Sequence, residues 1–217
     1  MQLHADLSRS ATVDSEALDW VASPMAGVER RMLERDGGEV ARATSVVRYA
    51  PGSSFAQHTH GAGEEFLVLQ GVFSDETGDF PQGFYVRNPP GSRHAPSSAP
   101  GAVILVKLRQ MPAAETQPLR LDTRDPALWQ DRGVEGQEAV LFAAPWEHVT
   151  MLRLPRGYQG GAETYAGGVE LFVVAGDLAI AGTRHGTGTW LRRPAGSTLA
   201  LASHGGALLY RKTGHLG

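Results

Sequence analysis

The sequence predicts an all-β protein made of two tandem β domains. Its 217 residues include 27 Gly and 13 Pro, spaced among short β-branched and aromatic runs, which is typical of strands joined by tight turns. Helical periodicity is weak, apart from a turn or two expected near residues 14–21 and 125–129. A long internal repeat is the third observation, and it sets the number of domains.

The repeat becomes visible when Gly157 is placed under Gly52, an offset of 157 − 52 = 105 positions. The offset holds without a gap over residues 45–107 and their copies. The residues that recur at their +105 positions are Arg48, Gly52, Thr59, Gly63, Glu65, Val68, Gly71, Gly83, Arg87, Pro89, Gly91, Ser92, Gly101 and Lys107. A repeat of this length indicates a duplicated domain rather than a small stacking unit.

We place the domain boundary in the polar stretch between Pro112 and Pro118. The sequence therefore predicts one domain over residues 1–112 and a second over residues 113–217.

Composition excludes several kinds of chemistry. The chain has no cysteine, which removes disulfides, thiolate catalysis and cysteine-based metal sites and leaves His and carboxylates as the strong ligands. The net charge is −3 and no basic cluster follows any segment, so nucleic acid is not an expected partner. The N-terminus lacks a signal-peptide pattern and no apolar run could span a bilayer. We expect a cytoplasmic protein without a membrane partner, forming a homodimer and taking a small-molecule ligand or substrate.

Two short motifs bring together residues that are suited to binding a metal. The first contains His58, His60 and Glu64, and the second ends at His94 after a Pro-Pro-Gly turn. His58 and His60 are two positions apart, so on a strand their side chains share a face. Three imidazoles and a carboxylate suit Zn, Fe, Mn, Ni or Cu, and affinity alone does not choose among these metals. We expect one divalent metal per chain, with these four residues as its ligands.

The repeat acts as an internal control on this assignment. The four positions His58, His60, Glu64 and His94 correspond to Glu163, Tyr165, Val169 and Leu199. All four ligand types are lost together while the turn glycines and prolines remain, which indicates that the four residues act as one chemical unit. The second domain is expected to lack a metal. The other histidines are interpreted as structural or surface residues: His4, His148, His185, His204 and His215.

The copy also separates Glu64 from its neighbour. Glu65 recurs as Glu170, and the chain's two lysines, Lys107 and Lys212, occupy matched positions. We expect Glu65–Lys107 and Glu170–Lys212 to be equivalent pairs on the outer face of each domain. At a surface such a pair contributes at most about 1 kcal/mol, so its expected purpose is strand register.

With these residues in view, the chain resembles the cupin family. The family pattern Gly-x5-His-x-His-x3,4-Glu-x6-Gly is met by residues 52–71, and the pattern Gly-x5-Pro-x-Gly-x2-His by residues 83–94. Within cupins, residues 27–111 resemble the ChrR type, found in the C-terminal domain of ChrR anti-sigma factors, and small dioxygenases that act on carbonyl compounds. The resemblance implies two tandem cupin barrels (double-stranded β-helix, or jelly-roll), the second a degenerate copy without metal ligands.

The same resemblance implies two alternative functions. One is a non-haem, metal-dependent dioxygenase acting on a small carbonyl or hydroxyketone compound. The other is a non-catalytic metal or oxidative-stress sensor. ChrR anti-sigma factors use an N-terminal helical domain with His and Cys ligands to hold the sigma factor, and that domain is not expected here because cysteine is absent. ChrR favours zinc, and the dioxygenases favour iron. No catalytic residue beyond the metal ligands is assigned.

Several further residues flank the two motifs. If the alternation set by His58 and His60 continues, Phe66, Val68 and Gln70 point inward and line the cavity. Arg87 recurs in the copy, which favours a structural role. Arg93 does not recur and is a candidate contact for an anionic substrate.

Overall fold

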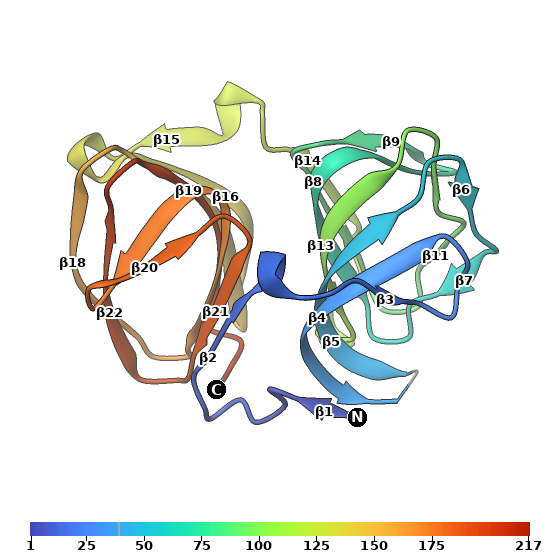
Figure 1. Cartoon of the computed structure of the whole chain (residues 1–217), viewed down its shortest axis with the longest axis horizontal. Helices are drawn as coiled ribbons and strands as arrows, with labels where there is room; N and C mark the ends of the chain where they lie inside the picture. Colours follow the sequence, from blue (N-terminus) through green and yellow to red (C-terminus); the bar gives the residue numbers. More distant parts are fainter. Residues whose placement is uncertain (39) are drawn as a thin grey trace. The chain divides into compact units, whose positions relative to one another are not determined.

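The computed structural model describes residues 1–38 and 40–217 and divides them into two compact units. The first unit consists of Met1–Ala5 and Leu18–Arg124, and the second consists of Asp6–Ala17 and Asp125–Gly217. Both units are antiparallel β structures (Figure 1). The predicted all-β class with two tandem barrels is confirmed.

The described residues of the first unit form thirteen strands, six of them only two residues long. They are β1 (Gln2–Leu3), β3 (Val21–Ala22), β4 (Val28–Gly37), β5 (Ala41–Tyr49), β6 (Ser53–Ser54), β7 (His58–Thr59), β8 (Glu64–Asp75), β9 (Gly78–Pro81), β10 (Phe84–Asn88), β11 (Arg93–His94), β12 (Ser97–Ser98), β13 (Ala102–Leu108) and β14 (Leu119–Asp122). The main sheet has the order β1-β4-β5-β13-β8-β10-β14, and β7 pairs with β11 in a separate ladder.

The second unit has ten strands and three short 3-10 helices. They are β2 (Ala11–Asp14), η1 (Ser15–Ala17), η2 (Pro126–Leu128), β15 (Trp129–Asp131), η3 (Gly133–Glu135), β16 (Gln137–Ala144), β17 (Glu147–Leu154), β18 (Tyr158–Tyr165), β19 (Val169–Ile180), β20 (Thr183–Gly186), β21 (Thr189–Arg193), β22 (Ser197–Ser203) and β23 (Ala207–Thr213). The sheet order is β15-β16-β17-β23-β19-β21-β2. The helical turns expected near residues 14–21 and 125–129 are present as η1 and η2.

The internal repeat is a structural repeat with the same offset. The path β4-β5-β13-β8-β10 of the first unit corresponds to β16-β17-β23-β19-β21 of the second. Gly71 and Gly176 show why the turn glycines recur. Both have positive φ, and a Cβ on either would collide with the backbone carbonyl oxygen of a facing glycine, Gly101 or Gly206.

Each unit is completed by a short strand from the start of the other repeat. β14 pairs with β10 through Phe84 and Asp122, and β2 pairs with β21 through Thr189 and Asp14. Figure 1 shows the dark blue β2 beside β21. These pairings cover sheet edges that would otherwise expose unpaired backbone groups.

Because β14 belongs to the first unit and β2 to the second, the division between the units differs from the predicted domain boundary. The boundary predicted between residues 112 and 113 differs from the observed division at Arg124, because the pairing of β14 with β10 ties the intervening residues to the first unit. Likewise, Asp6–Ala17 belongs to the second unit through β2. The sequence offset could not show this, because a short strand does not reveal its partner.

Buried arginines at repeated positions anchor the exchanged segments. Arg87 on β10 donates from Nε and Nη2 to the two carboxylate oxygens of Glu115, both at 2.7 Å, and both side chains are buried. In the second unit, Arg192 donates to the backbone oxygen of Asp6 at 2.8 Å. The structural role predicted for Arg87 follows from this geometry.

The predicted glutamate–lysine pairs have the expected register but not the expected exposure. Lys107 lies opposite Glu65, and Lys212 lies opposite Glu170. All four side chains are buried rather than solvated, so the small stability contribution typical of surface pairs does not apply to them. Glu65 also accepts a hydrogen bond from Arg87 at 3.0 Å, which places it in the buried network that anchors β14.

Each unit has its own hydrophobic core. In the first, Phe66, Phe73 and Phe80 pack with Val86 and Ile104, and the Phe66 and Phe73 ring centroids are 4.7 Å apart. The cluster in the second unit is rich in leucine and valine. Aromatic pairs at such distances contribute beyond the area that they bury.

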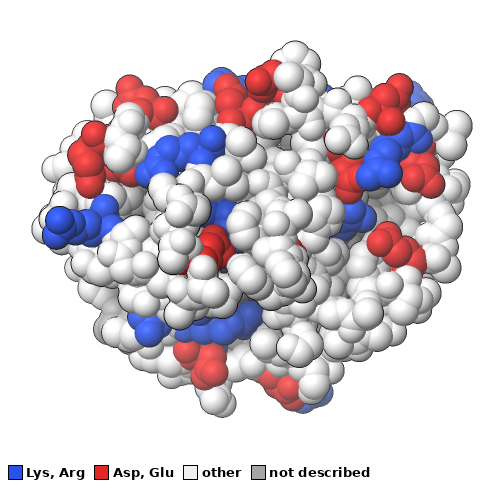
Figure 2. Space-filling view, turned by 180° about the vertical axis from the view of Figure 1, so that it is seen from behind, with Lys and Arg blue, Asp and Glu red and all other residues white. Residues whose placement is uncertain are grey.

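On the face drawn in Figure 2, Lys and Arg side chains are interspersed with Asp and Glu. In the part of the chain that the structure describes, no helix has the length and apolar character needed to cross a membrane.

We predict that Glu115→Ala lowers the free energy of unfolding by about 3–5 kcal/mol, because it leaves the buried Arg87 guanidinium without its main partner. Urea denaturation followed by circular dichroism measures the change. Glu29→Ala is the matched control, since it removes an exposed pair with Arg48 and is expected to cost less than about 1 kcal/mol. Equal losses in the two variants would contradict the anchoring role.

Candidate metal centre

Three histidines from two short strands converge in the first unit. β7 and β11 pair so that His58 lies directly opposite His94. His60 follows β7, and its backbone is held by reciprocal hydrogen bonds, from its N–H to Ser92 O at 2.9 Å and from Gly91 N–H to its own carbonyl at 2.8 Å. One nitrogen atom from each ring lies within 4.8 Å of one from each of the others, close enough for the three to share an ion.

Burial and ring geometry give the cluster its shape. His60 and His94 are buried, whereas His58 is partly exposed. The ring centroids are 5.0 Å apart for His58–His60 and His58–His94, and 4.7 Å apart for His60–His94. The Nε2 atom of His60 is buried and has no hydrogen-bond partner among the described residues. A buried, unsatisfied polar atom costs free energy, and a metal ion would satisfy this one.

Glu64 lies beside two of the three rings. Its Oε2 atom is 3.6 Å from His60 Nε2 and 3.5 Å from His94 Nε2. Asn88 on β10 donates to the same oxygen at 3.1 Å, which orients the carboxylate. Glu64 and Asn88 face each other across β8 and β10, so the sheet pairing itself sets this contact.

A second set of hydrogen bonds orients the rings. His94 Nδ1 is 3.2 Å from Asp75 Oδ2, and His58 Nδ1 is 3.3 Å from the carbonyl oxygen of Ala56. With these Nδ1 atoms engaged, Nε2 of each ring remains available to a metal. Carboxylates and carbonyls that accept from the second ring nitrogen are a regular feature of metal-binding histidines.

The same contacts explain opposite pKa shifts in two of the rings. Burial lowers the pKa of His60, and the neighbouring His94 and His58 lower it further against the charge of Glu64. Burial also opposes protonation of His94, but the hydrogen bond to Asp75 and the charge of Glu64 outweigh it and raise the pKa of His94.

A cavity of about 420 Å³ reaches the histidine cluster. Its charged wall residues are Arg30, Arg35, Arg109 and Glu64, so with neutral histidines the lining has a formal charge of 3 − 1 = +2 before any metal is added. Arg30 Nε is buried without a hydrogen-bond partner among the described residues. The cavity is therefore suited to negative charge.

Tyr49 also lines this cavity. Burial, together with the charge of Glu64, raises the pKa of the Tyr49 hydroxyl, which stays protonated and able to donate a hydrogen bond. Its counterpart in the second unit is Leu154, since 49 + 105 = 154. Tyr49, like the three histidines and unlike the turn glycines that recur, is therefore replaced in the second copy of the repeat.

The predicted cavity wall along β8 is wrong. Phe66 and Val68 are buried core residues, Gln70 is exposed, and none of the three is among the described residues that line the cavity. A β-bulge accounts for Gln70: Val103 pairs with Gln70 and Ile104 with Val68, which breaks the alternation between these positions. Phe66 and Val68 precede the bulge and pack in the hydrophobic core of the unit. Arg93 is exposed on β11 opposite Thr59 and is also not among the described lining residues.

The structure brings together the three predicted histidines, with Glu64 beside two of them, and adds supporting residues that the sequence did not predict. Asp75, Asn88, Tyr49 and Arg30 come from four different strands, and no fixed spacing links them to the motifs. The available signal was that Tyr49, Asp75 and Asn88, like the ligands, are not retained in the copy, where Leu154, Ile180 and Arg193 stand at the matched positions.

Comparisons with known proteins bear on the first domain and on the fold. Residues 8–112 match the family model of the ChrR cupin-like domain. Comparison with curated protein sequences finds no match.

Similar folds occur among solved structures. One is a protein of Nostoc punctiforme described as a candidate dioxygenase, with a TM-score of 0.78 and 17% identity, covering 96% of this chain and 84% of that one. Another is the bacterial pirin YhhW of Escherichia coli in complex with nickel(II), with a TM-score of 0.71 and 13% identity, covering 94% of this chain and 98% of that one. The 11S allergen of Cocos nucifera has a TM-score of 0.73 at 9% identity, covering 96% and 90%. At these identities the likeness establishes the fold alone.

Two antiparallel barrels, a histidine cluster built from the two motifs and the family match lead to one assignment. Residues 8–112 match the ChrR cupin-like domain, and the chain has the fold of the cupin structures that it resembles.

Proposed function

We propose that the first barrel is a metal-dependent oxygenase centre that acts on a small carbonyl or hydroxyketone compound. The ligands are His58, His60, Glu64 and His94. The observation that carries the proposal is the convergence of three histidine nitrogens at the wall of a cavity large enough for a small organic substrate. A first-row divalent ion at this site supplies Lewis-acid and, for iron, redox chemistry toward O₂ and a carbonyl group.

The residues around the ligands have separate tasks in this proposal. Asp75 and Asn88 hold His94 and Glu64 in orientation. Arg30, Arg35 and Arg109 in the wall would stabilise negative charge on a substrate oxygen. The neutral Tyr49 hydroxyl donates a hydrogen bond to the substrate.

A metal-dependent sensor is the second candidate function. It is favoured by the match of residues 8–112 to the ChrR cupin-like domain, which takes its description from an anti-sigma factor family. A sensor does not need a substrate-sized cavity beside the metal, and the cavity of about 420 Å³ therefore favours the oxygenase. Iron is the expected metal for an oxygenase, zinc is the metal implied by ChrR, and nickel is the ion bound in the YhhW structure.

The function is tested by O₂ consumption. Protein loaded with Fe(II) under anaerobic conditions is expected to consume O₂ when a small β-diketone or α-hydroxyketone is added, as measured with an oxygen electrode. Protein loaded with Zn(II) is the control and is expected to consume none. The oxygenase proposal is contradicted if untagged protein as purified contains one equivalent of zinc and shows no O₂ uptake after exchange to iron. That outcome would favour the sensor function.

The ligand set is tested by metal stoichiometry. We predict that His60→Ala reduces the bound metal from one per chain to nearly none, because the buried Nε2 atom is a central donor of the cluster. Elemental analysis of dialysed protein measures the ratio. Tyr165→Phe is the matched control at the repeated position, 60 + 105 = 165, and is expected to keep the full stoichiometry. A similar loss in both variants would contradict the asymmetry between the barrels.

The supporting shell is tested at Asp75. We predict that Asp75→Asn weakens metal binding about 10- to 100-fold, because the His94 ring loses its carboxylate partner. Chelator competition measures the affinity. Asp79→Asn on the neighbouring strand β9 is the control, since Asp79 contacts Ser74 rather than a ligand. Unchanged affinity in Asp75→Asn would remove Asp75 from the site.

A further inference from the structure

The second barrel keeps a cavity at the place where the first barrel holds its histidines. Its volume is about 490 Å³. In the first barrel the strand pairing sets His58 opposite His94, and in the second the matched pairing sets Glu163 opposite Leu199. Tyr165, the counterpart of His60, also lines this cavity. The copy has therefore lost the ligands but retained the space.

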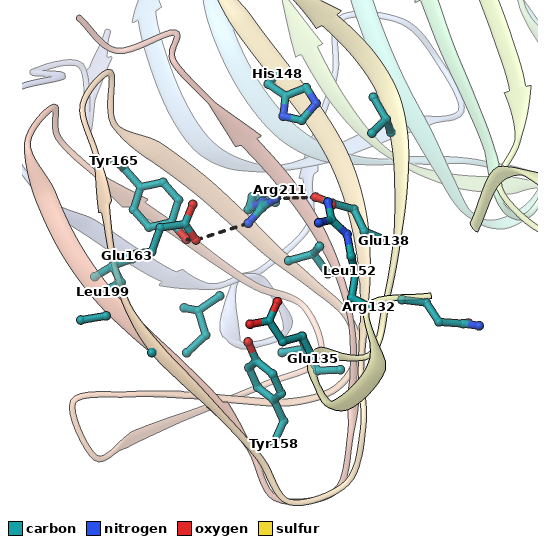
Figure 3. A pocket seen from close by; sticks show the side chains of 16 residues that line it. Arg132, Glu135, Glu138, His148, Leu152, Tyr158, Glu163, Tyr165, Leu199 and Arg211 are labelled. Atoms are coloured by element: carbon teal, nitrogen blue, oxygen red, sulfur yellow. Dashed lines mark hydrogen bonds and ion pairs between the residues drawn. The ribbon is translucent and has the colours of Figure 1, made fainter. Parts of the chain in front are cut away.

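A fixed guanidinium projects into this cavity (Figure 3). Arg211 donates from Nε to Thr150 Oγ1 at 3.1 Å and from Nη2 to Glu138 Oε1 at 2.7 Å, and its Nη1 atom is 3.6 Å from Glu163 Oε2. The matching residue in the first barrel is Val106, since 106 + 105 = 211. Because Arg211 is already paired with two carboxylates, an incoming anion would have to displace one of them.

The formal charge of the cavity lining favours a cation over an anion. Glu135, Glu138 and Glu163 face Arg132 and Arg211, so with neutral histidine the formal charge is 2 − 3 = −1. Figure 3 shows Glu135 next to the Tyr158 side chain, with Glu163 beside Tyr165.

Burial and the nearby carboxylates raise the pKa of two tyrosine hydroxyls in the cavity, those of Tyr158 and Tyr165. Burial raises the pKa of Tyr158, and the charges of Glu135 and Glu163 raise it further against the opposing charge of Arg211. Tyr165 donates to Glu163 Oε2 at 2.8 Å. A positively charged group near these oxygens would be stabilised, whereas an anion would be repelled.

Leucine side chains form an apolar part of the remaining wall, which also includes Gln137 and His148. Leu152, Leu154, Leu199 and Leu201 are buried members of the core of the second unit, and Tyr158 packs against the same cluster. A ligand that fills this end of the cavity gains free energy by removing hydrocarbon from water. The volume lies within the range of small-molecule sites, about 300–1,000 Å³.

We propose that the second barrel binds a small organic cation, an amine whose hydrocarbon body packs against the leucines and whose ammonium group lies near Glu135 and Glu163. The first cavity has a formal lining charge of +2 and the second a charge of −1. The duplicated fold thus presents two cavities of opposite charge preference. This binding site is independent of the metal and of the oxygenase reaction.

A matched series of probes tests the charge preference in metal-free, full-length protein, where an amine cannot bind through a metal. n-Pentylamine, 1-pentanol and pentanoate share one hydrocarbon chain and differ in the head group. Methyl NMR of leucine-labelled protein follows Leu152 and Leu199. Pentylamine is expected to shift these signals with a dissociation constant about tenfold below that of pentanol, and pentanoate is expected to leave them unchanged.

Two variants locate the binding. Glu163→Gln is expected to weaken pentylamine about tenfold while leaving pentanol unchanged. Because the Glu163 side chain is 57% exposed, this change is compatible with folding even where the cavity-filling Leu199→Trp is not. Leu199→Trp is expected to abolish binding of both pentylamine and pentanol. Glu64→Gln in the first barrel is the matched control and is expected to leave the dissociation constants of both probes unchanged.

The proposal is overturned if no probe shifts the cavity leucines, or if pentanoate or pentanol binds as tightly as pentylamine. It is also overturned if pentylamine binding is insensitive to Glu163→Gln.

Discussion

The pairing of β14 with β10 is the interaction on which the metal centre depends. β14 covers the edge of the first sheet, and Arg87 and Glu115 fix it there through a buried, bidentate ion pair. From β14, Arg120 reaches Asn88 at 3.4 Å, and Asn88 donates to Glu64 at 3.1 Å. The carboxylate beside the histidines is therefore oriented by a strand that begins the other repeat. β2 completes the second sheet in the same way at β21.

The duplication separates what the scaffold requires from what each cavity does. Gly71 and Gly176 recur because a facing carbonyl leaves no room for a Cβ, and this constraint is identical in the two barrels. Residues that point into the cavities have no such constraint. At the matched positions, His58, His60 and His94 correspond to Glu163, Tyr165 and Leu199, and Val106 corresponds to Arg211. The same backbone thus forms one histidine-lined cavity whose charged residues sum to +2 and a second cavity whose charged residues sum to −1.

Much of the site was predictable because it lies in two local motifs. The ladder between β7 and β11 brings His58 opposite His94, and although the two residues are 94 − 58 = 36 positions apart, each occupies a position that its motif marks. Asp75 and Asn88 were not predicted, because no motif position marks them and their contacts to His94 and Glu64 form only once the strands have paired. The cavity wall along β8 was mispredicted because Phe66 and Val68 pack in the hydrophobic core, and because the bulge between Val68 and Gln70 breaks the alternation at Gln70.

The sequence by itself determined the all-β class, the duplication and the four candidate ligands, because turn glycines, a constant offset of 105 and motif spacing are all properties of the linear chain. Only the tertiary structure decided which strand completes which barrel, that the Glu65–Lys107 pair is buried, and how charge is distributed in each cavity. Cavity charge is a sum over side chains from many strands, such as Arg30 on β4 and Arg109 after β13. These side chains line one cavity only after their strands have paired, so the cavity charge cannot be read from the linear sequence.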